Sequence, residues 1–148
     1  MINNEMKVRF TAIKENESFA RLCIASFCAG LNPTVDELGD IKTAVSEAVT
    51  NSIVHAYPNS VGDVEINVRI DSYCNIYITV SDFGIGIENV EQAKQPFFTS
   101  KPDMERSGMG FTVMEGFMDS LAVESEKGIG TKVIMTKKLG DYSIAVGG

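Results

Sequence analysis

The segment SDFGIGI, residues 81–87, ends a strand-like stretch with Asp82 and continues with Gly84 and Gly86. Its letters include the Asp-Phe-Gly of protein kinases, in which the aspartate holds magnesium. A protein kinase needs two lobes, and a chain of 148 residues is too short for both. The kinase glycine-rich loop and His-Arg-Asp loop are also missing before Ser81. We therefore interpret the segment as Asp-x-Gly-x-Gly.

An aspartate in this pattern suits a pocket for a flat aromatic base. Its carboxylate can accept a hydrogen bond from an exocyclic amine, and the two glycines let the base approach the backbone closely. A glycine-rich turn after a strand is the simpler alternative for an isolated match. Other parts of the chain have to decide between the two.

The composition is that of a soluble globular protein, with 44% hydrophobic and 22% charged residues. A chain of this length buries roughly 70% of its unfolded surface, so we expect one domain over residues 1–148. The net charge of −7 argues against nucleic acid as a direct partner, because binding phosphate backbones needs clustered cations. The sequence suggests neither a signal peptide nor a membrane span, so we expect a cytoplasmic protein with reduced cysteines.

The first half of the chain predicts a short strand and a helix. The strand is KVRFTA at residues 7–12, and the helix begins near Asn16 and stops near Gly30. The apolar face of this helix is expected to consist of Phe19, Leu22, Cys23 and Phe27.

The clearest helix covers most of residues 32–58 and ends at Pro58. Thr34 and Glu37 have the spacing of a capping box at its start. At 1.5 Å per residue it is roughly 30 Å long, enough to cross a domain. Its stripe of small and apolar residues contains Leu38, Ile41, Val45, Ala48 and Ser52.

The second half of the chain alternates strands with one further helix. Strands are expected at residues 64–70, 76–82, 121–126 and 131–139, with a helix over 110–120. Residues 88–110 form a long polar loop, and loops of this length usually act as lids or binding loops. These elements predict an α/β (α+β) fold: a two-layer sandwich with helices on one face of a mixed, mostly antiparallel sheet.

Glu47 and Asn51 lie four residues apart on the long helix, so their side chains share one face roughly 6 Å apart. A solvated polar stripe is the commoner reason for such a pair, but small and apolar residues surround both positions. The amide oxygen of Asn51 could ligate magnesium, and the carboxylate of Glu47 could accept a proton from a nearby hydroxyl. His55 continues the line, and we expect a structural or pocket-edge role for it.

The run RSGMGF, residues 106–111, places two glycines immediately before the last helix. Backbone N–H groups at a helix start attract phosphate, and Arg106 could offset charge on a transferred phosphoryl group. A flexible glycine hinge is the alternative. At the final hairpin turn, Thr131 follows Gly128 and Gly130.

These motifs occur once each and in one order, and the ordered set resembles the ATP-binding family shared by gyrase, Hsp90, histidine kinases and MutL. The resemblance implies that ATP or ADP binds, that Asn51 coordinates Mg²⁺ and that Asp82 binds the adenine amine. Further nucleotide contacts are implied for Gly84, Gly86, Thr99, Ser107, Gly108, Met109, Gly110, Phe111 and Thr131.

Three segments, SEAVTNSIVHAY, QPFFTSKP and ERSGMGFTVME, resemble one branch of this family, the anti-sigma factors that also act as serine kinases. The resemblance implies a homodimer that inhibits a sporulation sigma factor and phosphorylates an anti-anti-sigma factor. Glu47 is then the general base for the substrate serine, and Arg106 steadies the γ-phosphate.

Two alternatives stay open at this point. A nucleotide-gated binding module without kinase activity would explain the short chain and an exposed-looking first helix, on which Arg21 could contact a partner. A histidine-kinase catalytic domain would need a phosphoacceptor on a separate dimerisation helix, whereas His55 lies on the nucleotide helix itself.

Overall fold

The computed structural model of the chain describes residues 2–94 and 110–139. Its strands are β1 (Ile2–Thr11), β2 (Asp63–Asp71), β3 (Asn75–Asp82), β4 (Ser120–Glu126) and β5 (Gly130–Lys138). Its α-helices are α1 (Glu15–Cys28), α2 (Val35–Asn51), α3 (Val90–Ala93) and α4 (Gly110–Phe117). A 3₁₀ turn, η1 (Ala29–Leu31), follows α1, and a π-helical turn, η2 (Ser52–Ala56), continues α2.

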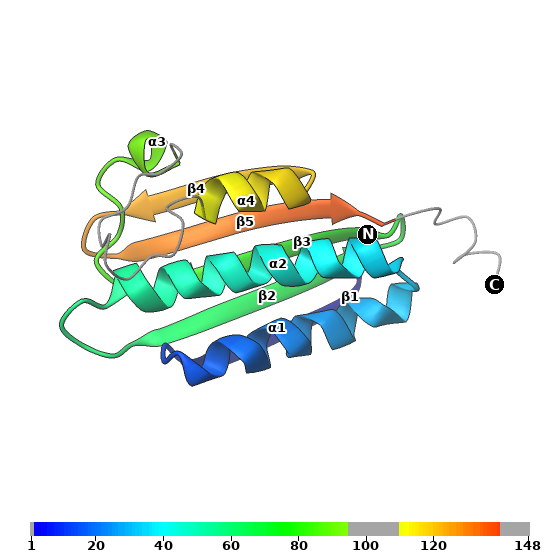
Figure 1. Cartoon of the computed structure of the whole chain (residues 1–148), viewed down its shortest axis with the longest axis horizontal. Coiled ribbons are helices and arrows are strands. Elements are labelled where there is room, and N and C mark those ends of the chain that lie inside the picture. The colour runs from blue at the N-terminus through cyan, green and yellow to red at the C-terminus, as the bar shows by residue number, and fades with distance from the viewer. Residues whose placement is uncertain (1, 95–109, 140–148) are drawn as a thin grey trace.

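The sheet has the strand order β1-β2-β3-β5-β4, and all of its pairings in the described part of the chain are antiparallel. Helices α1, α2 and α4 form a layer on one face, with α2 in the middle (Figure 1). The predicted two-layer sandwich with a mostly antiparallel sheet is therefore confirmed. Within the described residues, no helix is both long and apolar enough to span a bilayer.

The hydrophobic core lies between α2 and the sheet. Strand β2 alternates from Asp63 to Ile70, so that Val64, Ile66 and Val68 are fully buried beneath the helices. The opposite face of the sheet is open and carries charged pairs, such as Lys7 with Glu65 at 3.6 Å. One face thus supplies the core and the other is solvated, as expected for an antiparallel sheet.

Helix α2 follows its prediction closely. The Thr34 side chain accepts a hydrogen bond from the Glu37 backbone N–H, and the Glu37 carboxylate accepts one from the Thr34 N–H, which completes the capping box. The stripe residues Ile41, Val45 and Ala48 have no exposed surface. The chain then widens into the π-helical η2, a geometry that often marks functional sites.

The predicted apolar face of α1 is wrong for Phe19 and Leu22, whereas Phe27 packs against the core as expected. Phe19 and Leu22 are 54% and 58% exposed, and the buried side chains are instead Ala20, Ile24, Ala25 and Cys28. Apolar residues occur around most of this helix, so their spacing alone does not identify the buried side. Small side chains such as Ala20 and Cys28 are buried beside Ile24, and the larger Phe19 and Leu22 remain outside.

Two predicted boundaries also differ. The chain leaves α1 through η1 and turns at Asn32, whose φ of 55° is left-handed, so Gly30 is not the stop. The expected loop from Glu88 contains the one-turn helix α3, because the Asn89 side chain accepts a hydrogen bond from the Gln92 N–H and caps it.

Asp71 organises the tight turn between β2 and β3. Its carboxylate accepts hydrogen bonds from the backbone N–H groups of Tyr73 and Asn75 at 2.9 and 3.0 Å. The Asn75 amide and the Tyr77 hydroxyl donate two more, at 2.9 and 3.0 Å. These bonds hold Cys74 in the left-handed region, at a φ of 62°.

Candidate nucleotide-binding site

Asp82 is the centre of the candidate site. It is the last residue of β3, and only 7% of it is exposed. Its carboxylate accepts hydrogen bonds from the Ser52 hydroxyl at 3.2 Å, the Gly84 N–H at 3.1 Å and the Thr131 N–H at 3.2 Å. The end of α2, the segment after β3 and the start of β5 therefore meet at one carboxylate.

Burial raises the pKa of Asp82, and the hydrogen bonds from Gly84, Ser52 and Thr131 oppose that rise without cancelling it. The ionised group is a strong acceptor held in a poorly solvated place. It suits a ligand that brings a neutral hydrogen-bond donor.

Gly84 and Gly86 are required by close backbone contacts. A Cβ atom on Gly84 would lie 2.0 Å from the Ala56 carbonyl oxygen, and one on Gly86 would lie 2.4 Å from the Glu126 carbonyl oxygen. Gly86 also has a φ of 79°, which favours glycine. Asp-x-Gly-x-Gly is thus the point where η2 and the β4–β5 hairpin press against the segment after β3.

Asn51 ends α2 and lies against the start of α4. A Cβ atom on Gly110 would lie 3.0 Å from Asn51 Nδ2 and 3.1 Å from Asn51 Oδ1. Glu47 is half-buried one turn earlier on the same helix. The structure therefore brings together two predicted motifs that are far apart in the sequence, and Phe111 packs beside them against the core.

Thr131 is cross-strand from Asp82 and also contacts the neighbouring strand. Its backbone N–H binds Asp82, and its hydroxyl lies 2.8 Å from the hydroxyl of Ser125 on β4. Ser125 in turn accepts a hydrogen bond from the Ile87 N–H at 2.6 Å. This network joins the predicted threonine to the predicted glycine segment.

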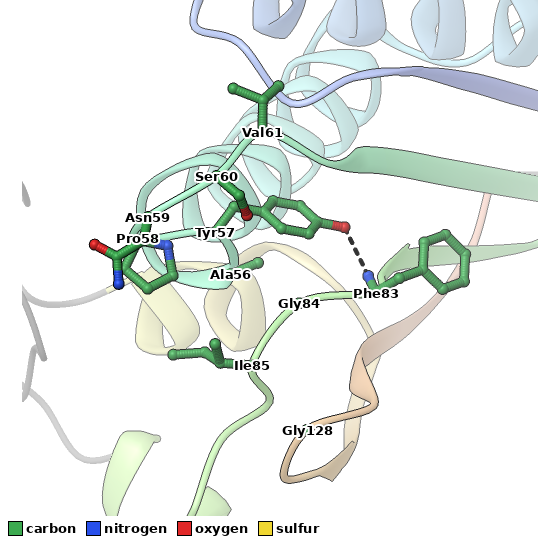
Figure 2. Close-up of a pocket in the computed structure, with 10 residues that line it drawn as sticks. All are labelled: Ala56, Tyr57, Pro58, Asn59, Ser60, Val61, Phe83, Gly84, Ile85 and Gly128. Atoms are coloured by element: carbon green, nitrogen blue, oxygen red, sulfur yellow. Dashed lines mark hydrogen bonds between the residues drawn. The ribbon is translucent and has the colours of Figure 1, made fainter.

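A groove of about 330 Å³ lies between residues 56–61 and residues 83–85 (Figure 2). It is lined by Ala56, Tyr57, Pro58, Asn59, Ser60, Val61, Phe83, Gly84, Ile85 and Gly128. The Tyr57 hydroxyl accepts a hydrogen bond from the Phe83 N–H at 2.8 Å and donates one to the Asp63 carbonyl at 2.7 Å. Asn51 and Asp82 are not among its lining residues, so this groove adjoins the candidate site through Gly84 without containing it.

Several predicted site residues lie outside the described residues. They are Thr99, Arg106, Ser107, Gly108 and Met109.

Ser52 is a site residue that sequence reasoning missed. Its position in the stripe of α2 indicated simple packing, and it is indeed 95% buried, with 5% of its surface exposed. Its hydroxyl, however, is bonded to Asp82. The available signal was a hydroxyl side chain immediately after Asn51 on an otherwise apolar face.

Arg21 lies on α1, away from Asp82, and is partly exposed. Its guanidinium is 3.9 Å from the Glu17 carboxylate and 3.4 Å from the Ser18 hydroxyl. Glu17 also accepts a hydrogen bond from Ser46 on α2. The buried Nε of Arg21 makes no hydrogen bond.

Residues 10–137 match the family model of the histidine kinase-like ATPase domain. This match, together with the antiparallel sandwich and the Asp82 site, defines an ATP-binding domain of the histidine-kinase type. An anti-sigma F factor of Clostridium acetobutylicum is 58% identical over 138 residues, which are 93% of this chain and 96% of that protein. An anti-sigma F factor of Bacillus licheniformis is 53% identical over 139 residues, which are 93% of this chain and 94% of that protein. The chain belongs to the anti-sigma F factor family.

Solved structures share the fold. The RsbU and RsbW domains of a Mycobacterium tuberculosis protein match with a TM-score of 0.68 and 16% identity, over 93% of this chain and 33% of that one. The histidine kinase domain of a blue-light activated histidine kinase from Erythrobacter litoralis matches with a TM-score of 0.54 and 25% identity. The match covers 71% of this chain and 48% of that one.

Proposed function

We propose that this chain is an anti-sigma factor that inhibits a sporulation sigma factor and is also an ATP- and Mg²⁺-dependent protein-serine kinase. Its kinase substrate is an anti-anti-sigma factor, and it works as a homodimer of one-domain subunits in the cytoplasm, where transcription occurs. The supporting observation is the meeting of Ser52, Gly84 and Thr131 at the carboxylate of Asp82. The identity to anti-sigma F factors supports the choice of partners.

The adenine end of the site is assigned to Asp82. Its carboxylate accepts a hydrogen bond from the exocyclic amine, which is a donor in adenine. Gly84 and Gly86 keep the backbone beside it free of side chains, so that a flat base can approach.

The phosphate end is assigned to Asn51 and the first turn of α4. Magnesium favours oxygen ligands and keeps several waters when it binds with phosphates, so the single amide oxygen of Asn51 is a fitting protein ligand. The N–H groups in the first turn of a helix have no partner within that helix, so those of α4 can donate hydrogen bonds to phosphate oxygens. When bound, the metal supplies positive charge that neutralises the phosphates.

We assign the role of general base to Glu47. The substrate serine gives its proton to the Glu47 carboxylate, its oxygen bonds to the γ-phosphorus, and the bond to the bridging oxygen breaks to release ADP. Arg106, which lies outside the described residues, is assigned to the γ-phosphate. Because this transition state is loose, positioning and charge neutralisation provide most of the rate.

The kinase assignment is tested with labelled ATP and a purified anti-anti-sigma factor. We expect Glu47→Gln to lower the rate of serine phosphorylation by at least about 100-fold, the usual contribution of a general base. Glu124→Gln, the same change at an exposed position of β4, is the control and retains the rate. A Glu47→Gln protein as fast as wild type rules out this base. If the protein binds nucleotide but transfers no phosphoryl group, it is a binding module. Acid-labile phosphate on His55 would indicate a histidine kinase.

The sigma-factor contact is assigned to the exposed side of α1. Phe19 and Leu22 present apolar surface there, beside the partly exposed Arg21. We expect Leu22→Ser and Arg21→Ala to weaken sigma-factor binding in a pull-down assay while ADP still binds. Val35→Ser removes another exposed apolar side chain, at the start of α2, and leaves the binding intact. Equal binding by all three variants excludes this surface.

A further inference from the structure

We infer that Tyr57 is a positioning residue whose hydroxyl holds the backbone after Asp82, so that the Asp82 carboxylate is aimed at the exocyclic amine of adenine. The inference rests on the proposed function, because it concerns the base assigned to Asp82. Tyr57 does not touch the base in this assignment. It acts through Phe83 and Gly84, the two residues that follow Asp82 in the chain.

Both hydrogen bonds of the Tyr57 hydroxyl have a fixed direction. The Phe83 N–H can only donate, and its nitrogen lies 2.8 Å from the hydroxyl oxygen. The Asp63 carbonyl can only accept, so it takes the hydroxyl hydrogen, at 2.7 Å. Tyr57 therefore ties the first residue of β2 to the first residue after β3, and Figure 2 shows the bond to Phe83.

The position of the Tyr57 ring is fixed by the chain around it. Pro58 follows directly, and a residue before proline avoids helical geometry, so the chain leaves η2 at Tyr57, with a φ of −128°. The ring lies against the backbone of Gly62, where a Cβ atom would be only 2.1 Å from the ring carbon Cε1. The ring also packs against the hydrophobic core. Its hydroxyl is therefore held at a defined place beside Phe83.

Gly84 lies between two anchored residues. On one side, the Phe83 N–H binds Tyr57, and on the other, the Ile85 N–H donates to a carbonyl oxygen of η2 at 2.9 Å. The Gly84 N–H itself donates to the Asp82 carboxylate at 3.1 Å. Gly84 therefore helps to orient this carboxylate, and its own position depends on the bond between Tyr57 and Phe83.

Loss of the Tyr57 hydroxyl would release one of these two anchors. Residues 83 and 84 could then move, and the Asp82 carboxylate would point at the amine for only part of the time. The affinity for a ligand that needs this orientation falls in proportion to the fraction of molecules that keep it. A ligand that lacks the amine does not use the carboxylate, so its affinity should stay the same.

Tyr77 provides a matched control near the other end of β3. Its hydroxyl also donates a hydrogen bond, to the Asp71 carboxylate at 3.0 Å in the turn between β2 and β3. Tyr57 and Tyr77 are both partly buried. Tyr77→Phe thus removes the same atom from a comparable tyrosine, away from the candidate site.

The experiment measures, by calorimetry on the full chain without a protein substrate, the affinities for ADP and for purine riboside diphosphate, which lacks the exocyclic amine. Wild type is expected to prefer ADP. Tyr57→Phe should reduce this preference about three- to tenfold through weaker ADP binding, the effect of one neutral hydrogen bond. Tyr77→Phe should leave the preference unchanged. The double variant Tyr57→Phe/Asp82→Asn should lose no more of the preference than Asp82→Asn alone, because both changes act on one interaction.

A Tyr57→Phe protein that prefers ADP as strongly as Tyr77→Phe does overturns the inference. An equal loss of affinity for both ligands also overturns it, because that result marks a merely structural role. If Tyr57→Phe melts below the assay temperature, Gly62→Ala carries the same prediction, since its methyl group would overlap the Tyr57 ring and displace the hydroxyl. Wild type that binds neither ligand, or both equally, would instead contradict the proposed function, so the two failures are distinct.

Discussion

The hydroxyl of Ser52 donates a hydrogen bond to the carboxylate of Asp82 at 3.2 Å. Ser52 immediately follows Asn51 at the end of α2, and Asp82 ends β3. The residue assigned to magnesium and the residue assigned to the base therefore belong to one connected scaffold. A shift of the end of α2 would move both ends of the candidate site together.

Replacing Ser52 by alanine is expected to weaken ADP binding about tenfold. The variant removes one donor from a buried carboxylate, and hydrogen bonds to charged groups contribute about 1.5–3 kcal/mol. The free energy of unfolding should fall by a similar amount. Calorimetry and urea unfolding measure the two effects. Ser46→Ala, whose hydroxyl on the same helix binds Glu17, should leave ADP affinity unchanged.

The affinity for ADP should depend on the ionisation of Asp82. Since burial raises the pKa of this carboxyl, its charged form is present above that raised pKa and is lost as the pH falls through it. ADP affinity should therefore decline as the pH falls through the pKa of Asp82. The Asp82→Asn variant should lose this pH dependence of ADP affinity. The folding stability of the nucleotide-free protein should depend on pH in the opposite direction. The stability that Asp82 contributes is greatest at low pH and is lost as the pH rises through its pKa. An affinity that stays constant on acidification would contradict the assignment of the base to Asp82.

Asp71 should make the protein sensitive to strong acid. Burial alone would raise its pKa, but the hydrogen bonds from Asn75, Tyr73 and Tyr77 outweigh it and lower the pKa from 3.8 to about 2. Its contribution to stability is complete above pH 3.8 and is lost as the pH falls through about 2. Urea unfolding of wild type and Asp71→Asn should differ at neutral pH and converge near pH 2. If the difference in unfolding free energy between wild type and Asp71→Asn stayed the same down to pH 2, the ionised carboxylate would not be what holds the turn.

Gly84→Ala should destabilise the fold by several kcal/mol. The new Cβ atom would lie 2.0 Å from the Ala56 carbonyl oxygen, which is backbone and cannot move aside cheaply. Gly39→Ala is the matched control, because Gly39 lies within α2 with nothing within 4 Å of a new Cβ. That variant should gain about 0.5–1 kcal/mol from helix propensity. Thermal unfolding measures the stability of both variants. If Gly84→Ala were as stable as wild type, η2 would be able to move away from residues 83–85.

Local patterns predicted the elements well. The capping box of Thr34 and Glu37 depends on residues three apart, and the alternation in β2 depends on neighbours, so both could be read directly. The buried side of α1 could not, since Ala20 and Phe19 are both apolar and only the packing partner decides which faces inward. The side chain of Phe19 is the one that remains outside.

The candidate site was predicted by its motifs rather than by its contacts. Asp82, Gly84 and Thr131 were identified, because each belongs to a short recognisable pattern. Ser52 and Ser125 were not, because their roles depend on a partner that only the strand register and the docking of α2 bring near. A hydroxyl on an apolar face can indicate that a polar partner exists, as for Ser52, but the sequence does not show which residue that partner is.

The open face of the sheet has a practical consequence. It carries Lys7 and Lys132, whose side chains are exposed and lie on the opposite side of the sheet from α2. A tether or a dye attached at these two positions would not cover Asn51 or the exposed side of α1. Nucleotide and partner proteins can then be measured on one immobilised molecule.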